Sequence, residues 1–568
     1  MHAAEILLEQ GLLTEHQLDQ ARQHGGNSIL DAAIALRFVT EDDALRAIGR
    51  AVGLDYADLS SLGNDGEMQK LLEGFPQKLI YRQSLFPIRR FNGSIVVATS
   101  DPFDLYPLDE VSAATGLCVT PVLASRHEIA KLIKKHLGVG GETVDNLVAQ
   151  TVDEDEVQLL DGIETDGSEL CEQAQEASVV RLVNEMLLEA IETRASDVHI
   201  ESQPSGMVLR YRIDGMLHPQ PLPPEISRFE SAIISRLKIM SRLNIAEKRL
   251  PQDGRIKLKV RGREVDVRVS VIPMIHGESI VMRILDKGAM RFDLRSLGMD
   301  ERTYEIYRQL IELPHGIVLV TGPTGSGKTT TLYSSLLEIN QADIKIVTTE
   351  DPVEYQLEGI NQIQVHAKIG LSFAQSLRSI LRHDPDVVLV GEIRDLETAE
   401  NAIQASLTGH LVFSTLHTND AAGAYTRLVD MGVEPFLVSS TVEAVMAQRL
   451  VRRLCGHCKQ PYHPRREDLP PDFPWEALDH APLFRPAGCR ECRNAGYSGR
   501  LGIYELLVTT EEVRRLAHEN ASSWDLKKAA VASGMTTLRS DGWKKALAGA
   551  TSVDEVARVT KGDRLVTT

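Results

Sequence analysis

The first 60 residues carry apolar side chains at helical spacing. Apolar positions recur three or four residues apart, which predicts short amphipathic helices over residues 1–60. Thr14 stands where an N-cap residue would, and Thr40 repeats its surroundings about 26 residues later. We interpret this as a degenerate two-fold repeat, which has too few copies for a solenoid.

The pattern changes twice between residues 61 and 178. Residues 61–137 mix strand-like apolar runs with helical stretches, which predicts a small α+β domain. Residues 138–178 lose the pattern, because no Lys or Arg lies between Lys135 and Arg181 while twelve acidic residues lie from Glu142 to Glu176. Such a block repels itself and resists packing, so an extended acidic linker is expected. An acidic docking segment is the alternative.

Alternating side chains return in residues 179–290. The run 264–271 places valine at every second position and polar residues between them, which predicts a sheet buried on one face only. A strand over 208–213 ends at Asp214 and Gly215, a turn signal, and residues 179–190 have helical periodicity. We predict a second α+β domain over 179–290.

From residue 291 the apolar runs become continuous. They lie at 317–320, 344–347, 387–390 and 411–413, with helical patterns between them. Continuous runs of this kind indicate strands buried on both faces, as in a parallel sheet covered by helices. The predicted architecture is therefore multidomain α/β, with a core over 291–505 and a helical region over 506–568.

Composition and charge exclude several classes of protein. The chain has 568 residues, too many for one compact core. Its net charge of −18 repels nucleic-acid backbone, so no nucleic-acid partner is expected. No apolar run approaches the length of a membrane span, and the first residues lack the features of a signal peptide. We expect a soluble, unexported, cytoplasmic protein.

A phosphate-binding loop follows the first of the continuous apolar runs. It matches the pattern G-x-x-x-x-G-K-[ST] between a strand and a helix, the context that this motif requires. Its residues are Gly322, Pro323, Thr324, Gly325, Ser326, Gly327, Lys328 and Thr329. Backbone amides and the helix N-terminus attract phosphate oxygens, Lys328 is expected at the β/γ-phosphates, and Thr329 is expected to bind Mg²⁺.

Polar clusters follow three other predicted strands. Glu350, Glu392 and His417 each stand directly after or close behind an apolar run. In open α/β sheets, ligands bind beyond the carboxyl ends of the strands, so these groups should lie near the loop 322–329. Each cluster alone could be a helix cap or an ion pair. Their convergence favours hydrolysis of a nucleotide.

Four of the six cysteines form two C-x-x-C pairs separated by 30 residues. The pairs are Cys455 with Cys458 and Cys489 with Cys492. This spacing predicts a closed tetrahedral Zn²⁺ site of structural type within an insertion over 450–495. A redox pair is the weaker alternative, because no thioredoxin-like strand precedes either pair. Cys118 and Cys171 are interpreted as inert thiols.

Basic residues cluster next to the first cysteine pair. A zinc ion with four thiolates carries a net charge of −2, and nearby cations would offset it. They are Arg449, Arg452, Arg453 and Lys459. A second interpretation is that the same cluster binds anionic lipid headgroups.

Several of these segments together resemble one family. Residues 349–354 resemble the aspartate box of secretion ATPases, 386–395 their Walker B region, and 408–419 their histidine box. Over about 177–510 the chain is similar to the hexameric assembly ATPases of type II secretion and type IV pilus machines. The sequence segments 245–255 and 404–410 favour the type II secretion branch.

The resemblance implies a RecA-like P-loop ATPase that uses ATP, Mg²⁺ and Zn²⁺ and forms a homohexamer. It implies arginines that act between subunits: Arg268 and Arg283 match positions that reach the γ-phosphate from the second domain. Arg378 and Arg382, before the Walker B region, match further arginines of the family. The alternative for Arg268 is an ion pair with Glu264 or Asp266. Glu350, Glu392 and His417 are the remaining expected catalytic residues. The implied role is to power pseudopilus assembly and export, with pilus extension as the alternative.

The N-terminal region departs from the family pattern. Related domains bind cyclic di-GMP through paired R-L-G-x-x-L-V-x-x-G segments, whereas here residues 2–11 lack the Arg-Leu-Gly start and Arg37 replaces a closing glycine. We therefore expect residues 1–137 to dock a protein, which the family implies is the cytoplasmic domain of an inner-membrane platform protein. The acidic charge opposes a zinc-dependent nucleic-acid-binding ATPase, and the complete set Lys328, Thr329, Glu350 and Glu392 opposes a cyclic-dinucleotide-sensing adaptor.

Overall fold

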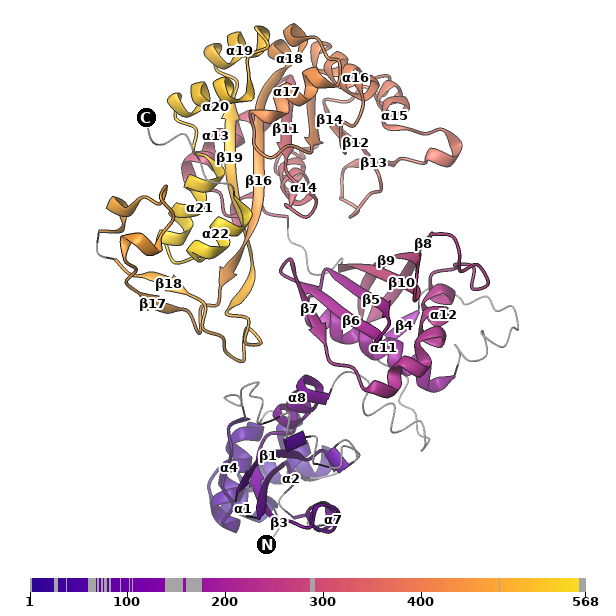
Figure 1. Cartoon of the computed structure of the whole chain (residues 1–568), viewed down its shortest axis with the longest axis vertical. Helices are drawn as coiled ribbons and strands as arrows, with labels where there is room; N and C mark the ends of the chain where they lie inside the picture. Colours follow the sequence, from indigo (N-terminus) through magenta and orange to yellow (C-terminus); the bar gives the residue numbers. More distant parts are fainter. Residues whose placement is uncertain are drawn as a thin grey trace. The chain divides into compact units, whose positions relative to one another are not determined.

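The chain divides into two compact units in the computed structural model. Unit 1 is Met1–Gly288 and unit 2 is Ala289–Thr568 (Figure 1). The structure describes residues 3–24, 29–36, 38–59, 68, 71–72, 75, 79–80, 83–91, 93–101, 103–104, 106–137, 157–159, 176–286, 292–479 and 481–560. Arg37, Cys171 and most of the predicted acidic linker therefore lie outside the described residues. None of the described helices is long and apolar enough to cross a membrane.

Unit 1 begins with helices, as predicted. They are α1 (Ala3–Glu9), α2 (Glu15–His24), α3 (Ile29–Ala35) and α4 (Glu41–Val52). The hydroxyl of Thr14 accepts a hydrogen bond from the amide of Gln17, and that of Thr40 accepts one from the amide of Asp43. The two threonines therefore cap equivalent helices, which explains the repeat seen in the sequence.

A small sheet with two helices follows. Its elements are β1 (Phe86–Phe91), β2 (Ser94–Thr99), α7 (Tyr106–Thr115), β3 (Cys118–Leu123) and α8 (Arg126–Leu137). Strand β2 pairs antiparallel with β1 and parallel with β3. The amide of Ala57 donates to the carbonyl of Leu123, so the end of the helical region joins the edge of this sheet.

The second part of unit 1 is an antiparallel sheet, in which seven described strands follow the order β4-β8-β9-β10-β5-β6-β7. The strands are β4 (Val157–Leu159), β5 (Asp197–Gln203), β6 (Gly206–Ile213), β7 (Met216–Gln220), β8 (Gln252–Val260), β9 (Arg263–Met274) and β10 (Gly277–Asp286). Three helices accompany it: α11 (Ala177–Glu192), the 3₁₀ turn η2 (Pro224–Phe229) and α12 (Glu230–Met240).

One face of this sheet is apolar and the other is polar, as the alternation in residues 264–271 predicts. Val265, Val267 and Val269 are buried in a core that includes Val183 of α11 and Ile233 of α12. One detail differs from the expectation. Strand β4 lies inside the predicted acidic linker, because Val157 and Leu159 alternate with a polar residue and pair with β8.

Unit 2 contains a second sheet, in which seven described strands follow the order β13-β12-β14-β15-β11-β16-β19. The strands are β11 (Gly316–Thr321), β12 (Ile346–Glu350), β13 (Asn361–Gln364), β14 (Val387–Val390), β15 (Leu411–Leu416), β16 (Val442–Leu454) and β19 (Tyr497–Val508). All neighbours pair parallel except β19, which is antiparallel to β16. The four continuous runs read from the sequence are β11, β12, β14 and β15, whereas β13, β16 and β19 were missed.

Helices cover both faces of this sheet (Figure 1). The helices up to α18 are η3 (Leu294–Leu297), α13 (Glu301–Ile311), α14 (Lys328–Glu338), η4 (Ala367–Ile369), α15 (Phe373–Ile380), α16 (Leu396–Leu407), α17 (Gly423–Asp430) and α18 (Pro435–Thr441). Ile317 and Leu319 pack in the core that includes α16, while Val318 and Val320 pack in the core that includes α13 and α14. Successive residues of β11 thus point into opposite cores, which explains the continuous apolar run.

Strands β16 and β19 form a long pair that carries the cysteine insertion between them (Figure 1). The insertion contains β17 (Gln460–Tyr462), η5 (Arg466–Asp468), η6 (Trp475–Leu478) and β18 (Leu483–Arg485). The chain then forms α19 (Glu511–His518), α20 (Ser523–Ala532), α21 (Leu538–Leu547) and α22 (Val553–Val559). Phe473 and Leu483 of the insertion share a small core with Trp543 of α21 and Val556 of α22.

Candidate functional site

The loop 322–329 follows β11 and leads into α14, and glycines within it have positive φ angles. Gly322 and Gly327 have φ values of 151° and 92°. A Cβ on Gly322 would lie 2.6 Å from the carbonyl oxygen of Gln448, and one on Gly327 would lie 2.8 Å from the Nε2 atom of Gln448. Both positions therefore need glycine, for conformation and for space.

Lys328 is the first residue of α14, and its amine lies over the start of the loop. Its Nζ donates to the carbonyl oxygens of Gly322 at 2.7 Å and Pro323 at 3.2 Å. The pKa of Lys328 is lowered to about 8, mainly by burial and also by Arg449, while Glu392 opposes the shift. Thr329 follows at an exposed position of the same first turn. The amine of Lys328 therefore lies beside the loop that follows β11.

Glu392 and His417 meet beyond the ends of two neighbouring strands. His417 Nε2 lies 3.2 Å from Glu392 Oε2, and Arg394 forms an ion pair with the other carboxylate oxygen. Burial raises the pKa of Glu392, but the hydrogen bonds and charges of Arg394 and His417 outweigh this and hold it below its ordinary value. Glu392 is therefore an ionised carboxylate, oriented by two basic groups.

The strand order explains which predicted residues come together. Strand β15 lies between β11 and β14, so His417 can contact Glu392 beside the loop 322–329. Glu350 ends β12, which lies three strands from β11, or about 14 Å at the usual spacing of parallel strands. Strand order is a property of the tertiary fold, and the sequence alone left it open.

Glu350 has partners of its own. Tyr333 of α14 hydrogen-bonds to its Oε2, while Thr348 at 2.6 Å and Gln362 at 3.1 Å donate to Oε1. The residue as a whole is 4 % exposed. Its assignment as a hydrolytic residue stays a prediction, and here its hydrogen bonds tie β12 to α14.

Sequence reasoning missed two residues on the other side of the loop. Strand β16 pairs with β11 up to Thr321, so Gln448 and Arg449 lie just beyond the end of β11. Gln448 accepts a hydrogen bond from Thr331 at 2.7 Å, and Arg449 Nη2 donates to the carbonyl of Asn419 at 2.8 Å. The apolar run over 444–447 was the signal that could have identified this strand.

Arg268 and Arg283 lie in unit 1, on the polar face of the antiparallel sheet. Strand register places Arg283 opposite Arg268, and Arg268 opposite Arg255. Asp197, on the other side of Arg283, accepts from its Nε at 3.2 Å. Adjacent strands thus carry a row of guanidinium groups. Asp266, one of the two alternative partners predicted for Arg268, forms an ion pair with Arg255.

Arg378 and Arg382 lie at and after the end of α15, and both are exposed. Arg378 forms an ion pair with Glu397 at 2.5 Å and accepts, through its carbonyl, a hydrogen bond from Arg382 at 2.7 Å. The two arginines therefore share one surface of unit 2.

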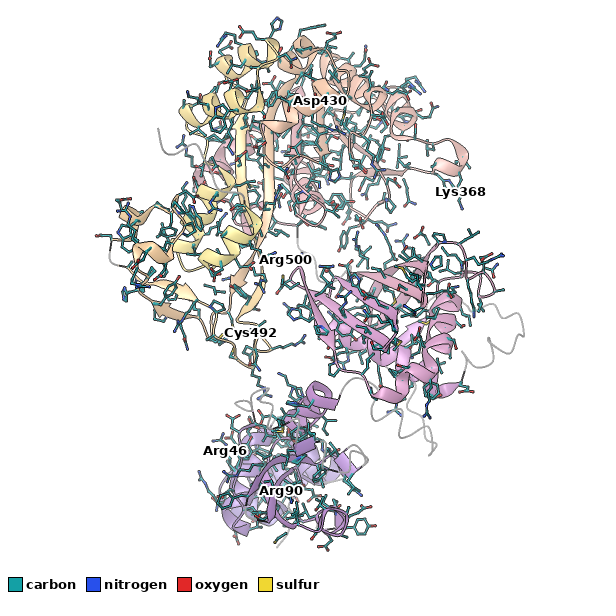
Figure 2. The ribbon with its side chains drawn as sticks, in the orientation of Figure 1. Arg46, Arg90, Lys368, Asp430, Cys492 and Arg500 are labelled. Atoms are coloured by element: carbon teal, nitrogen blue, oxygen red, sulfur yellow. The ribbon has the colours of Figure 1, made fainter. Side chains whose placement is uncertain are left out.

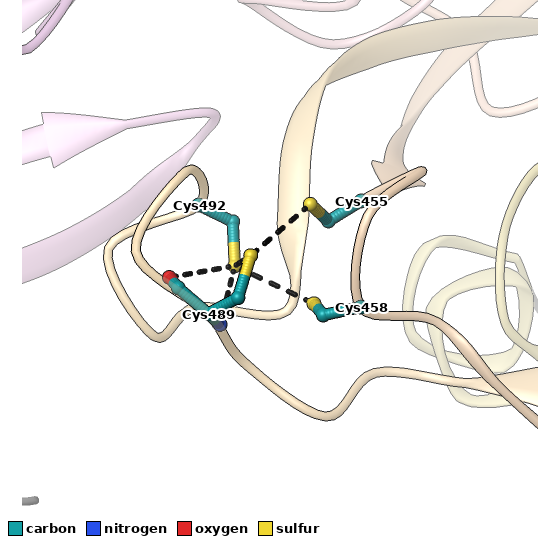
Figure 3. A group of neighbouring side chains, drawn as sticks. All are labelled: Cys455, Cys458, Cys489 and Cys492. Atoms are coloured by element: carbon teal, nitrogen blue, oxygen red, sulfur yellow. Dashed lines mark hydrogen bonds between the residues drawn. The ribbon is translucent and has the colours of Figure 1, made fainter. Parts of the chain in front are cut away.

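The two cysteine pairs meet in one cluster (Figure 3). The sulfur atoms of Cys455 and Cys489, of Cys458 and Cys492, and of Cys489 and Cys492 are each 3.7 Å apart. A tetrahedron with metal–sulfur bonds of about 2.3 Å has edges of about 3.8 Å, so the four residues fit a tetrahedral thiolate site. The amide of Gly488 donates to the sulfur of Cys458 at 3.3 Å, and that of Gly496 donates to the sulfur of Cys492 at 3.2 Å. Hydrogen bonds of this kind orient the ligands of metal sites.

The basic residues near the cysteines have partners inside the protein. Arg452 pairs with Glu555 at 2.5 Å, and its guanidinium lies over the ring of Tyr497. Lys459 donates to the carbonyl of Gly549 at 2.9 Å, and Arg449 lies beside the phosphate loop instead. Three of the four cations therefore have partners within the protein, and binding of anionic lipid headgroups stays a prediction.

Comparisons with known proteins show which family the chain resembles. A family model described as "Type II/IV secretion system protein" matches residues 172–558, and an MshEN domain model matches residues 52–143. The chain is 45% identical over 564 residues to the type II secretion system protein E of Xanthomonas campestris, which covers 98% of both chains. It is 41% identical over 566 residues to the type IV pilus assembly ATPase PilB of Myxococcus xanthus, which covers 99% of both.

A solved structure shows the same fold at low identity. The ATPase DotB of Yersinia pseudotuberculosis aligns with a TM-score of 0.50 and 19% identity, over 72% of this chain and 99% of that one. At this identity the likeness concerns the fold alone. The predicted fold class, a P-loop ATPase core with preceding domains and a four-cysteine insertion, is confirmed.

Proposed function

Because the chain belongs to the type II/IV secretion system protein family, we propose that it is a motor ATPase that hydrolyses ATP with Mg²⁺. The observation that carries this proposal is the meeting of Lys328, Glu392 and His417 at one end of the parallel sheet. The three residues follow three neighbouring strands, β11, β14 and β15, and lie far apart in the sequence. An ion pair with a purely structural role would not need to lie beside a phosphate-binding loop.

Each residue of the site has a role that follows from its chemistry. The loop amides and the N-terminus of α14 hold the phosphates, and Lys328 compensates the charge of the β- and γ-phosphates. Thr329 would hold Mg²⁺, which neutralises charge between the phosphates. Glu392, ionised and oriented by Arg394 and His417, is positioned to accept a proton from the attacking water.

The arginine row of unit 1 is suited to stabilising the charge that develops on the transferring phosphoryl group. Guanidinium groups stabilise charge that spreads over a transferring phosphoryl group. We propose that Arg268 and Arg283 act on the nucleotide of a neighbouring copy in a homohexamer, together with Arg378 and Arg382 on unit 2. Asp197 holds Arg283 at the surface rather than in the core, which supports this role.

The machine we propose is a type II secretion system, in which the ATPase drives pseudopilus assembly. It would act in the cytoplasm at the inner membrane, with residues 1–137 docked on the cytoplasmic domain of a platform protein. The relative from Xanthomonas campestris supports this choice over nearly the whole chain. Pilus assembly is the second candidate, because the relative from Myxococcus xanthus matches over the same length.

We propose Zn²⁺ as the metal of the four-cysteine cluster. Four thiolates at tetrahedral spacing leave no open coordination position, so the role is structural. Cys455, Cys458, Cys489 and Cys492 would hold the ion and join the two ends of the insertion. Zinc would then help to hold the insertion against α21 and α22.

Phosphate release by the purified full chain tests the enzymatic proposal. Lys328→Ala should lower turnover at least about a hundredfold, because the site loses its cation at the phosphates. Lys368→Ala is the matched control, because Lys368 is an exposed lysine of the 3₁₀ turn η4, between β13 and α15 (Figure 2). Equal turnover of Lys328→Ala and the control would contradict the proposal.

A cellular experiment separates the two machines. The gene in the source organism is replaced by the Lys328→Ala version, and both exported proteins and surface pili are measured. Loss of export with normal piliation supports the secretion role. Loss of pili with normal export would assign the chain to pilus assembly instead.

A further inference from the structure

A buried carboxylate joins the nucleotide site to the C-terminal helices. Glu505 lies on β19 and is 0 % exposed. Its Oε1 accepts from the amide of Ala421 at 2.9 Å, and its Oε2 accepts from the amide of Leu538 at 3.2 Å. Ala421 ends the loop that follows β15, and Leu538 begins α21. One side chain therefore fixes two segments that are far apart in the sequence.

A lysine from a third segment completes the arrangement. Lys527 of α20 places its Nζ 3.7 Å from Glu505 Oε2 and 3.8 Å from Asp420 Oδ2, and its side chain is 14 % exposed. Burial raises the pKa of Glu505, while Lys527 and the two amides lower it and Asp420 raises it. The carboxylates of Asp420 and Glu505 are thus held close together by the lysine between them.

The loop 417–421 is also hydrogen-bonded to residues beside the phosphate-binding loop. The amide of Thr418 donates to the hydroxyl of Thr321 at 2.9 Å, and Arg449 donates to the carbonyl of Asn419 at 2.8 Å. Its first residue, His417, contacts Glu392. A shift of Asp420 and Ala421 would therefore be passed along four residues to the group that orients Glu392.

Stability alone is a weak reason for this arrangement. Removing a charged pair from water is costly, and apolar side chains of similar size often stabilise a fold as well or better. Two backbone amides and a lysine on one carboxylate fix a geometry, which an apolar contact would not do. The elements that this geometry fixes are α20, α21 and the loop that carries His417.

We propose that Glu505, together with Lys527, is a positioning residue that sets the loop 417–421 of the nucleotide site from the C-terminal helices. The inference rests on the proposed ATPase function and extends it to a part of the chain outside the phosphate site. Glu505 touches neither nucleotide nor water in the reaction. It acts through Asp420, Ala421 and His417 on Glu392.

Two substitutions disturb the arrangement in different ways. In Glu505→Gln, the amide keeps one acceptor oxygen but turns an N–H₂ group toward a backbone donor, so one of the two hydrogen bonds is lost. In Lys527→Met, the side chain keeps its length but leaves Asp420 and Glu505 facing each other without a cation. Lys528→Met on the same helix is the matched control, because Lys528 is exposed.

Steady-state kinetics of the full chain gives the first readout. Both variants should lower kcat about tenfold while KM for ATP changes less than about threefold, because the loop orients the group that acts on water. Rates are expressed per chain able to bind a fluorescent ATP analogue, which removes the effect of misfolded protein. Lys528→Met should match the wild type.

Hydrogen exchange gives a second readout that does not depend on activity. Amides of residues 417–423 should exchange faster in Lys527→Met than in Lys528→Met, while those of the loop 322–329 should not change. A kcat within about twofold of the control, or unchanged exchange over 417–423, would overturn the proposal. If Glu505→Gln does not fold, Lys527→Met decides. If the wild type shows no ATP hydrolysis, the proposed function fails, and exchange alone decides on positioning.

Discussion

The two large sheets of this protein differ in how many of their faces are buried. The antiparallel sheet of unit 1 buries one face against α11 and α12 and exposes the other, which carries Arg255, Arg268 and Arg283 in register. The sheet of unit 2, whose described strands are parallel apart from β19, is covered on both faces. Its polar chemistry is therefore confined to the ends of strands.

This difference decides how a functional residue can be recognised in each unit. On the antiparallel sheet, a charged residue at every second position is the expected solvent face, so an arginine there carries little information by itself. After a continuous apolar run, a charged residue marks the end of a buried strand, where ligands bind. The phosphate site was therefore easier to predict than the arginine row.

The largest expected effect tests the strand ends of unit 2. Glu392→Gln should lower ATP turnover about a thousandfold while binding of ATP is retained, because an amide cannot accept the proton of water. Binding is followed with a fluorescent ATP analogue, and turnover by phosphate release. Asp430→Asn on α17 is the control, an exposed carboxylate on the same unit (Figure 2). Turnover close to that of the control would remove Glu392 from the mechanism.

The next effect tests the polar face of unit 1. Arg283→Ala should lower turnover about a hundredfold, less than the loss of a single arginine finger, because four arginines are proposed to share the charge. Mixing this variant with Lys328→Ala should restore part of the activity, since each copy supplies what the other lacks. Mixed oligomers as inactive as the separate variants would exclude action between copies.

A third prediction compares the two burial patterns directly. On β8, Leu258→Ala should cost about 2–5 kcal/mol, because it leaves a cavity in the core. The neighbouring Lys259→Ala should change stability by less than about 0.5 kcal/mol, because Lys259 is exposed. On β11 the corresponding neighbours, Val318→Ala and Leu319→Ala, should both destabilise the protein, because both are 0 % exposed.

Opening free energies from hydrogen exchange measure these changes within each unit, so that unfolding of the other unit does not interfere. The decisive quantity is the difference in destabilisation between the two neighbouring substitutions of each strand. This difference should be large on β8 and small on β11. A large difference on β11 would mean that one face of the parallel sheet is not packed as the structure has it.

The smallest effect on turnover is expected outside both sheets. Cys455→Ser should abolish zinc binding, measured by elemental analysis, and speed hydrogen exchange over residues 455–496. Exchange should also rise in α21 and α22, because the insertion shares a core with Trp543 and Val556. Binding of ATP should persist, since the phosphate loop has its own core.

Two outcomes would contradict the zinc assignment. Full zinc occupancy in the double variant of Cys455 and Cys489 to serine would mean that the metal lies elsewhere. A disulfide that forms under mild oxidation without metal would indicate a redox role. The binding free energy of structural zinc in small peptides is about 10–16 kcal/mol. An intact site should therefore be fully occupied, and partial loss of zinc in a variant should be readily detected.

Periodicity predicted much of the fold. Thr14 and Thr40 cap equivalent helices, the turn at Asp214 and Gly215 follows β6, and four apolar runs became β11, β12, β14 and β15. Strand β16 was missed because its apolar run continues into the basic stretch before Cys455, which looked like part of the metal site. The domain boundaries that we drew from the sequence stay predictions.

What the sequence by itself determined is local chemistry. The loop 322–329 and the spacing of the four cysteines each require particular residue types at fixed separations along the chain, and a short stretch suffices to recognise them. The tertiary structure decided which separate stretches meet. It placed Glu392 beside His417, held Glu350 by Tyr333, and brought Glu505 to the loop after β15. Strand order sets these contacts, and strand order follows from how both faces of a sheet are buried, which no local pattern contains.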